Sequence, residues 1–179
     1  MKFDTIVNQQ LVETDRLILR PLRRSDAGAL EMYCTDERVA RMTRNVPQPV
    51  PPGATEALVA RALDEERTED VWAMDGSATG LSEVVGLISL ERMDREQSEI
   101  GYWVAPAFWN TGLASEAVRA LIEANPQNAK TLFASVFQDN PASARVLTNA
   151  GFEYLGDAEA YAVARGTTVP TWTYLKRLD

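Results

Sequence analysis

Two short segments carry residue types and spacings that suit ligand binding and proton transfer. In the first, Pro106 ends a strand and Gly112 stands directly before a helix that begins at Leu113. Such a loop directs free backbone N–H groups and the positive helix end towards one point, which suits a phosphate or pyrophosphate. Gly112 lets the backbone approach such a ligand without an intervening Cβ. The alternative is an ordinary strand-to-helix turn, because the segment matches neither a Walker loop nor a G-x-G-x-x-G fingerprint.

The second segment is a short helix expected between Asn140 and Ala150. Asn140 supplies an N-cap, Pro141 suits the first helical position, and Gly151 stands just past the end. Ser143 shares one stripe of this helix with residues at helical spacing, namely Val146, Leu147 and Ala150. Its side chain therefore faces inward from the first turn, although a serine there also commonly satisfies the helix end.

The composition limits the chemistry that is available. The 179 residues include no histidine, which excludes Ser-His-Asp and Cys-His mechanisms and the usual zinc sites, so no metal site is expected. Acid–base chemistry must use carboxylates, hydroxyls, amines or water. The single cysteine, Cys34, excludes an intramolecular disulfide.

The charge balance bears on the partners. Eighteen Lys and Arg against 26 Asp and Glu give a formal charge of −8, which argues against nucleic acid and fits a basic or amine-bearing partner, although acidity also serves solubility. No apolar run reaches the roughly 18–20 residues that cross a membrane. The first ten residues lack the apolar run of a signal peptide, so a cytoplasmic location is expected.

The hydrophobic periodicity predicts an α+β fold in one domain, residues 1–179. Strands are expected at 17–22, 71–74, 84–90, 99–104, 131–136, 153–163 and 169–176. Helices are expected after caps at Ser25-Asp26, Asp36 and Thr55, and over 113–124 and 140–150. The proline-rich stretch 47–53 is expected to be a loop. The central strands are expected to form an antiparallel meander, followed by a strand-helix-strand unit.

In this order, the two segments resemble the GCN5-related N-acetyltransferase (GNAT) superfamily, in particular its branch of ribosomal-protein N-terminal acetyltransferase-like enzymes. The resemblance begins at TDRLILRPL (14–22) and continues through VGLISL (85–90) and IGYWV (100–104). It implies the GNAT fold, a mixed and mostly antiparallel sheet flanked by helices and splayed between strands 99–104 and 131–136. Acetyl-CoA would lie in the opening.

The resemblance also implies which residues bind that cofactor. The pyrophosphate would be bound by the backbone amides of the loop and first helical turn: Asn110, Thr111, Gly112, Leu113, Ala114 and Ser115. The strand edge at Trp103 and Val104 would pair with the pantetheine amides, as an added strand pairs with a sheet. Asn140 would lie near the pantetheine arm in addition to capping its helix. Asn110 replaces the glycine that is usual in this branch, a change that leaves the backbone amides in place.

A second departure concerns the proton donor. The tyrosine that commonly serves as general acid seven residues after the helix asparagine is Leu147 here. Ser143 is the best replacement, because it lies on the inward stripe and the ribosomal branch also has serine there. A thiolate leaving group with a pKa of roughly 8.5 needs only modest assistance.

The acceptor amine must lose a proton before it attacks, and Glu99 is the candidate base. Glu99 shares a strand face with Gly101 and Trp103, and family members often place a glutamate here that acts through water. A strand-end glutamate in solvent is the alternative. Glu116 is interpreted as favourable charge in the first turn of its helix rather than as a catalyst. Among the four tryptophans, packing is the default, and only Trp103 is expected near the acceptor.

Together these features predict an N-acetyltransferase in which a primary amine, on a protein N-terminus or a small molecule, attacks acetyl-CoA directly. The oxyanion would be stabilised by a strand amide near Val104. The main alternative is a non-catalytic acyl-CoA-binding sensor or interaction module, which the missing tyrosine favours. A purely structural domain would require both segments to match by chance. The protein is expected to be a monomer or a homodimer.

Overall fold

The computed structural model describes residues 8–178, so residues 1–7, on which the signal-peptide argument largely rests, lie outside it. Eight strands form one sheet: β1 (Val12–Glu13), β2 (Ile18–Pro21), β3 (Glu69–Asp75), β4 (Gly86–Met93), β5 (Gln97–Val104), β6 (Thr131–Phe137), β7 (Glu153–Ala162) and β8 (Thr167–Arg177). Five α-helices accompany it: α1 (Ala27–Cys34), α2 (Glu37–Ala40), α3 (Ala54–Ala62), α4 (Leu113–Ala124) and α5 (Pro141–Asn149). Three short 3₁₀ turns are η1 (Arg24–Asp26), η2 (Ser77–Thr79) and η3 (Pro106–Phe108).

The sheet has the order β1-β2-β3-β4-β5-β6-β8-β7, and every pair is antiparallel except β5 with β6. That parallel pair is brief, because it runs only from Gln97 opposite Thr131 to Glu99 opposite Phe133. Beyond this point both strands continue, but they no longer pair. The α+β class and the splayed mixed sheet predicted from the sequence are therefore confirmed.

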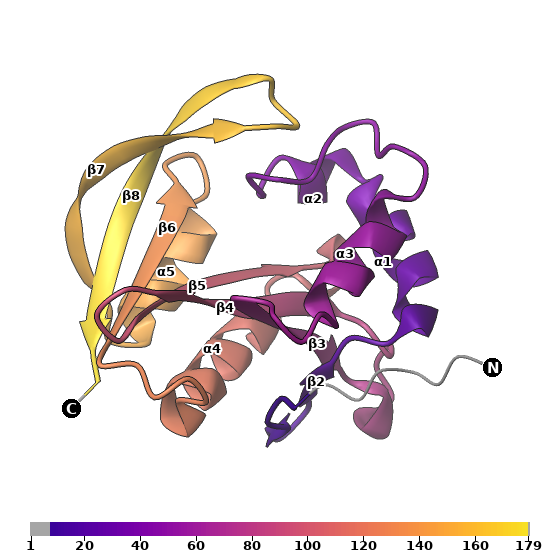
Figure 1. Ribbon diagram of the computed structural model, residues 1–179. Helices are drawn as coiled ribbons and strands as arrows, with labels where there is room; N and C mark the ends of the chain where they lie inside the picture. Colours follow the sequence, from indigo (N-terminus) through magenta and orange to yellow (C-terminus); the bar gives the residue numbers. More distant parts are fainter. Residues whose placement is uncertain (1–7, 179) are drawn as a thin grey trace.

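Helices cover both faces of the sheet (Figure 1). On one face, α4 and α5 bury Leu121 and Leu147 in the larger apolar cluster, where they meet sheet residues such as Ile100. On the other face, α1 and α3 bury Leu30 and Val59 in a second cluster. Because apolar side chains of this size stabilise by about 1.5–3 kcal/mol each when fully buried, the two clusters fix both faces of the sheet.

Two of the expected helix caps differ in the structure. The N-cap of α3 is Gly53, which has a positive φ of 81°, and Thr55 lies buried inside the helix. Asp26 is buried beside Arg20 and makes no capping bond to α1, because its carboxylate is used in that ion pair. Asp36 does cap α2, where its side chain accepts a hydrogen bond from the backbone N–H of Arg38 at 2.9 Å.

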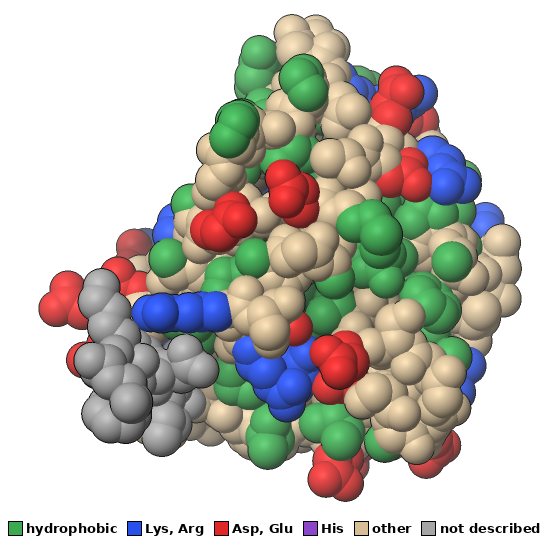
Figure 2. Space-filling view, turned by 90° about the vertical axis from the view of Figure 1, so that its right-hand side faces the viewer, with side chains coloured by type: hydrophobic (Ala, Val, Ile, Leu, Met, Phe, Trp, Pro, Cys, Tyr) green, Lys and Arg blue, Asp and Glu red, His purple; other side chains and the backbone are tan. Residues whose placement is uncertain are grey.

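Acidic and basic side chains are interspersed with apolar ones on the face that Figure 2 shows, so the excess of acidic residues forms no continuous patch there. Within residues 8–178, no helix is both long and apolar enough to cross a membrane.

Candidate functional site

Two clefts meet where β5 and β6 separate. The first cleft, about 630 Å³, lies on the α4 and α5 side of the sheet, and the second cleft, about 600 Å³, lies on the α3 side. Both are lined by residues of the separated strands and of the α2–α3 loop: Met42, Ile100, Gly101, Tyr102, Trp103, Ser135 and Phe137. The sheet is therefore open from one face to the other at this point.

The loop before α4 presents free backbone N–H groups to the first cleft. Asn110 and Gly112 both have positive φ angles, 59° and 80°, which turn the chain into the helix. Among the described residues, no acceptor receives a hydrogen bond from the N–H groups of residues 110–115. The left-handed backbone at Asn110 also explains why glycine suits this position, and asparagine is among the side chains that tolerate it best.

Two side chains hold this loop. The indole Nε1 of Trp109 donates to the carbonyl of Val104 at 2.7 Å, and the hydroxyl of Thr111 donates to the carbonyl of Phe108 at 2.5 Å. The guanidinium of Arg38 lies 5.9 Å from the centre of the Trp109 ring, and Arg38, on α2, also lines the first cleft.

Glu116 holds the same loop through its contacts with Thr14 and Arg16. Its carboxylate accepts hydrogen bonds from the Thr14 hydroxyl and from the N–H and Nε of Arg16, while Nη1 of Arg16 donates to the carbonyl of Thr111 at 2.9 Å. Burial alone would raise the pKa of Glu116, but the hydrogen bonds from Thr14 and Arg16 hold it below its usual value. Glu116 thus lies in the first turn of α4 and holds the loop through Thr14 and Arg16; that it is not a catalyst stays a prediction.

The open edge of β5 exposes alternate peptide groups. The carbonyl of Trp103 points to β4, since a Cβ on Gly86 would lie 2.2 Å from it. The neighbouring backbone groups of Tyr102 and Val104 therefore point to the gap, and the carbonyl of Val104 is bonded by Trp109. Tyr102 and Val104 are accordingly the residues whose backbone can pair with a ligand. Trp103 lines the gap with its side chain instead and contacts Tyr33 edge-on at 6.1 Å.

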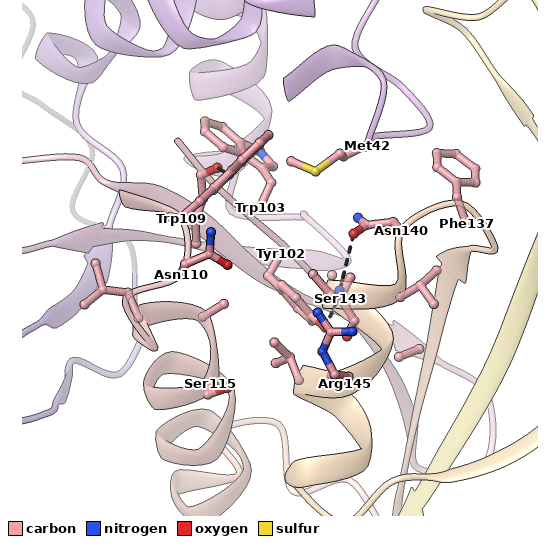
Figure 3. A pocket seen from close by; sticks show the side chains of 18 of the residues that line it. Met42, Tyr102, Trp103, Trp109, Asn110, Ser115, Phe137, Asn140, Ser143 and Arg145 are labelled. Atoms are coloured by element: carbon pink, nitrogen blue, oxygen red, sulfur yellow. Dashed lines mark hydrogen bonds between the residues drawn. The ribbon is translucent and has the colours of Figure 1, made fainter. Parts of the chain in front are cut away.

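At the start of α5, three residues form a hydrogen-bonded group inside the first cleft (Figure 3). The backbone N–H of Ser143 donates to Oδ1 of Asn140 at 3.3 Å, so Asn140 caps the helix as predicted. The Tyr102 hydroxyl donates to the carbonyl of Ser143 at 2.8 Å, and Oγ of Ser143 donates to the Tyr102 hydroxyl at 3.1 Å. Leu147, one turn further on, is fully buried.

The second cleft has a row of glutamates on its floor. Glu69, Glu91 and Glu99 stand opposite one another on β3, β4 and β5, so their side chains share one face of the sheet. Burial, followed by repulsion from Glu91, raises the pKa of Glu69. Glu99 forms an ion pair with Arg44 at 2.5 Å. Like charges directly opposite on neighbouring strands are unfavourable, so this row reduces stability.

The structure separates the two candidate catalytic residues by the sheet. Ser143 lines the first cleft and Glu99 the second, and Tyr102 and Trp103 lie between them and line both. Trp72 is fully buried, as expected for packing, and its Nε1 donates to the carbonyl of Gln10.

Sequence reasoning did not identify the arginines of the first cleft. Arg165 is held by Asp139 at 2.6 Å and by the carbonyl of Arg41 at 2.9 Å. Arg145, on the exposed side of α5, lines the same cleft, and its side chain has neither a hydrogen bond nor an ion pair within the described chain. An unpaired cation beside free backbone amides is a signal for an anionic ligand, and its position becomes evident only in the folded chain.

Residues 16–153 match the family model of the acetyltransferase (GNAT) domain. The chain belongs to this family. It is also 30% identical over 170 residues to YoaA, an uncharacterized N-acetyltransferase of Bacillus subtilis (strain 168), over 92% of this chain and 94% of YoaA.

Solved structures share the GNAT fold. RimL, the ribosomal L7/L12 α-N-protein acetyltransferase in complex with coenzyme A, aligns with a TM-score of 0.80 and 19% identity over 95% of this chain and 99% of RimL. Spermidine N-acetyltransferase from Vibrio cholerae, in complex with CoA and spermine, aligns with a TM-score of 0.77 and 15% identity over 91% and 96% of the two chains. The family match and the similarity to YoaA, in turn, identify the protein as an acetyltransferase of the GNAT family.

Proposed function

We propose that this GNAT protein transfers the acetyl group of acetyl-CoA directly to a primary amine through the opening between β5 and β6. The observation that carries the proposal is the passage through the sheet, with free amides on one side and carboxylates on the other. One substrate carries phosphates and the other carries an ammonium group, so each cleft suits one of them.

The residues of the first cleft fit the cofactor. The free N–H groups of residues 110–115, at the positive end of α4, would bind the pyrophosphate. The unpaired edge of β5 at Tyr102 and Val104 would bind the pantetheine amides in the manner of an added strand. Asn140 would lie beside the pantetheine arm, and Trp103 would border the acetyl group.

The second cleft would bind the acceptor amine. The glutamate row supports a cationic acceptor, because it concentrates negative charge beside the opening. Glu99 would accept a proton from the amine, directly or through water, after Arg44 moves away from it. RimL acts on a protein N-terminus and the Vibrio cholerae enzyme is a spermidine acetyltransferase, so both an α-amine and a polyamine are candidate acceptors.

Ser143 would donate a proton to the departing sulfur. Nucleophilic attack by the amine breaks the C–S bond, and the sulfur receives the electron pair. Because a thiol has a pKa of roughly 8.5, a hydroxyl donor at this point suffices. The backbone N–H of Val104 would stabilise the oxyanion, since it points into the gap.

Thermal unfolding with and without acetyl-CoA tests the cofactor site. At about 100 times the dissociation constant, the ligand should add roughly 2.7 kcal/mol to the free energy of unfolding and raise Tm by several degrees. Adenosine alone should give no shift. The absence of a shift at millimolar acetyl-CoA would contradict the proposal.

A screen of amines, monitored by thiol release, then tests transfer. Peptides with free N-termini and di- or polyamines are the first acceptors to compare. Ser143→Ala and Glu99→Gln should lower kcat while acetyl-CoA binding is retained. Binding of acetyl-CoA without transfer to any amine would instead identify a sensor.

A further inference from the structure

Tyr102 is a half-buried tyrosine whose hydroxyl is hydrogen-bonded to Ser143, the candidate proton donor. It lies on β5, on the opposite side of the first cleft from α5, and its ring crosses the base of the cleft to reach Ser143 (Figure 3). Two hydrogen bonds join the residues: Oη of Tyr102 donates to the backbone carbonyl of Ser143 at 2.8 Å, and Oγ of Ser143 donates to Oη at 3.1 Å. Packing alone would require neither bond, because a phenylalanine would fill the same space.

The Tyr102 hydroxyl lies at the same helix turn as Leu147, which stands where family members commonly have a tyrosine. In an α-helix the carbonyl of Ser143 faces the N–H of Leu147, four residues on, so the Tyr102 hydroxyl is a second donor to a carbonyl of this same turn. Leu147 is fully buried and does not line the first cleft. The structure thus brings a tyrosine hydroxyl from strand β5 to this turn of α5.

We propose that Tyr102 positions the Ser143 hydroxyl for proton delivery to the sulfur of the departing coenzyme A. This inference rests on the proposed function, because it gives Ser143 the role of donor. Tyr102 acts through Ser143 and is therefore a positioning residue. The bond that Oγ donates to the Tyr102 hydroxyl fixes the orientation of the serine side chain, and the Oγ proton turns from the phenol oxygen to the sulfur when it is delivered. The bond from Tyr102 to the Ser143 carbonyl ties β5 to α5.

The proton transfers balance within the reaction. As the amine nitrogen bonds to the thioester carbon and the C–S bond breaks, the electron pair goes to sulfur, which takes the proton of Ser143 Oγ. The Tyr102 O–H can then turn from the Ser143 carbonyl to Oγ, 3.1 Å away, and stabilise the negative charge there. The acceptor ammonium loses one proton to Glu99 before it attacks, and after the attack its nitrogen releases a second proton, which restores the Ser143 hydroxyl. In net, one proton goes from nitrogen to Glu99 and one from nitrogen to sulfur.

The environment of Tyr102 keeps its hydroxyl protonated for this role. Burial raises the pKa of Tyr102 well above its usual value, more than the bond with Ser143 lowers it. The phenol therefore retains its O–H over the working pH range of the reaction and donates a hydrogen bond without losing its proton.

A double-mutant cycle tests the proposal, with the amine that the screen identifies as acceptor. Tyr102→Phe should lower kcat by about 10- to 100-fold and change the KM for acetyl-CoA by less than about twofold. Tyr102→Phe combined with Ser143→Ala should be no slower than Ser143→Ala alone, because Tyr102 acts through Ser143. Tyr174→Phe, which removes the hydroxyl of a buried tyrosine, is the control and should retain wild-type kcat.

Two results would overturn the proposal: a Tyr102→Phe enzyme with wild-type kcat, or a double variant whose loss is the product of the two single losses. Coenzyme A affinity, measured on each variant, separates a structural effect, which lowers it, from the positioning effect, which leaves it unchanged. Thermal unfolding should show only the loss of the hydrogen bond that Tyr102 donates, a fall in Tm of a few degrees for Tyr102→Phe. If Tyr102→Phe does not fold, Tyr102→His takes its place and must meet the same criterion. Failure of the proposed function is distinct, since the wild type would then transfer no acetyl group.

Discussion

Individual side chains determine the charge of each cleft. The second cleft contains the row of Glu69, Glu91 and Glu99, of which only Glu99 has an arginine partner at ion-pair distance among the described residues. The first cleft contains Arg145 without a partner in the described chain. The glutamate row is unfavourable for the isolated protein, and both arrangements favour ligands of opposite charge.

Glu69→Gln should stabilise the protein at pH 7. Because the pKa of Glu69 is raised in the folded state, its ionised form costs stability, and this cost grows as pH rises through the raised pKa. Removing one like-charge neighbour should gain about 0.2–1 kcal/mol, or roughly 1–3 °C in Tm. The gain should vanish near pH 4, where the wild-type carboxyl binds its proton. Thermal unfolding at both pH values measures this, with the exposed Glu123→Gln as control.

A lower Tm for Glu69→Gln at pH 7 would contradict this account. The same variant should raise the KM of a cationic acceptor, because one charge of the row is lost. Stability and acceptor binding are thus expected to change in opposite directions at this residue.

Arg145→Gln should weaken coenzyme A binding about tenfold, since a hydrogen bond to a charged group contributes roughly 1.5–3 kcal/mol. Isothermal titration with coenzyme A and with 3′-dephospho-coenzyme A measures the effect and identifies the phosphate. A loss confined to coenzyme A assigns the 3′-phosphate, and equal losses assign the pyrophosphate. Arg119→Gln, an exposed arginine of α4 outside the first cleft, is the matched control. Unchanged affinity for both ligands would show that Arg145 binds neither phosphate.

At the scale of the elements, a buried ion pair network joins β2, η1 and β3. Nε of Arg20 donates to Asp75 at 2.8 Å, and its two Nη atoms donate to Asp26 at 3.0 Å each. All three side chains are at most 10% exposed. The network therefore fixes one end of the meander on which the second cleft is built.

Asp75→Asn should lower the free energy of unfolding by about 3 kcal/mol at pH 7, because it leaves part of the buried Arg20 charge uncompensated. Burial would raise the pKa of Asp75, but the bonds from Arg20 and Ser77 lower it overall. Its stabilising contribution is therefore present above the ordinary carboxyl pKa and is lost as pH falls through the lowered value. Urea unfolding between pH 3 and pH 7 should show the two proteins converging in acid. Asp15→Asn, at an exposed site, should change little, and a constant difference at all pH values would exclude this explanation.

Most elements could be predicted from the sequence because their signals are local. Asn140 and Pro141 define the start of α5, a run of apolar residues defines β4, and apolar residues at every second position define β5. The two-residue strand β1 was missed, since so short a strand has no periodicity and exists only through its pairing with β2. The glycine cap of α3 was missed because Thr55 offered the more usual capping side chain.

In the site, relations between residues that are close in the sequence were predictable, and contacts between distant residues were not. Asn140 and Ser143 belong to one helix turn, so their relation follows from spacing, whereas the splayed strands followed only from the family resemblance. The contacts of Tyr102 with Ser143 and of Arg44 with Glu99 join residues 41 and 55 positions apart. No local pattern carries such pairs, because they depend on how the sheet is assembled.

At the scale of the whole molecule, the two halves of the sheet, which separate between β5 and β6, are connected again by contacts of the β7–β8 turn. The turn between β7 and β8 reaches the segment that follows α2 (Figure 1), where the N–H of Val163 donates to the carbonyl of Arg44 and Arg165 donates to that of Arg41. The same segment carries the arginine that pairs with Glu99. These contacts therefore connect the position of the β7–β8 hairpin to Glu99, the candidate base.

The opening through the sheet also has a consequence for the order of events. In the proposed arrangement each cleft binds one substrate from its own face of the sheet, so neither molecule would have to depart before the other arrives. Initial velocities measured against both concentrations should therefore give double-reciprocal lines that intersect, and parallel lines would indicate an acetylated enzyme instead. A saturating concentration of one substrate should leave the cleft of the other substrate accessible. The two substrates should therefore not compete for binding, and neither should inhibit the reaction at high concentration.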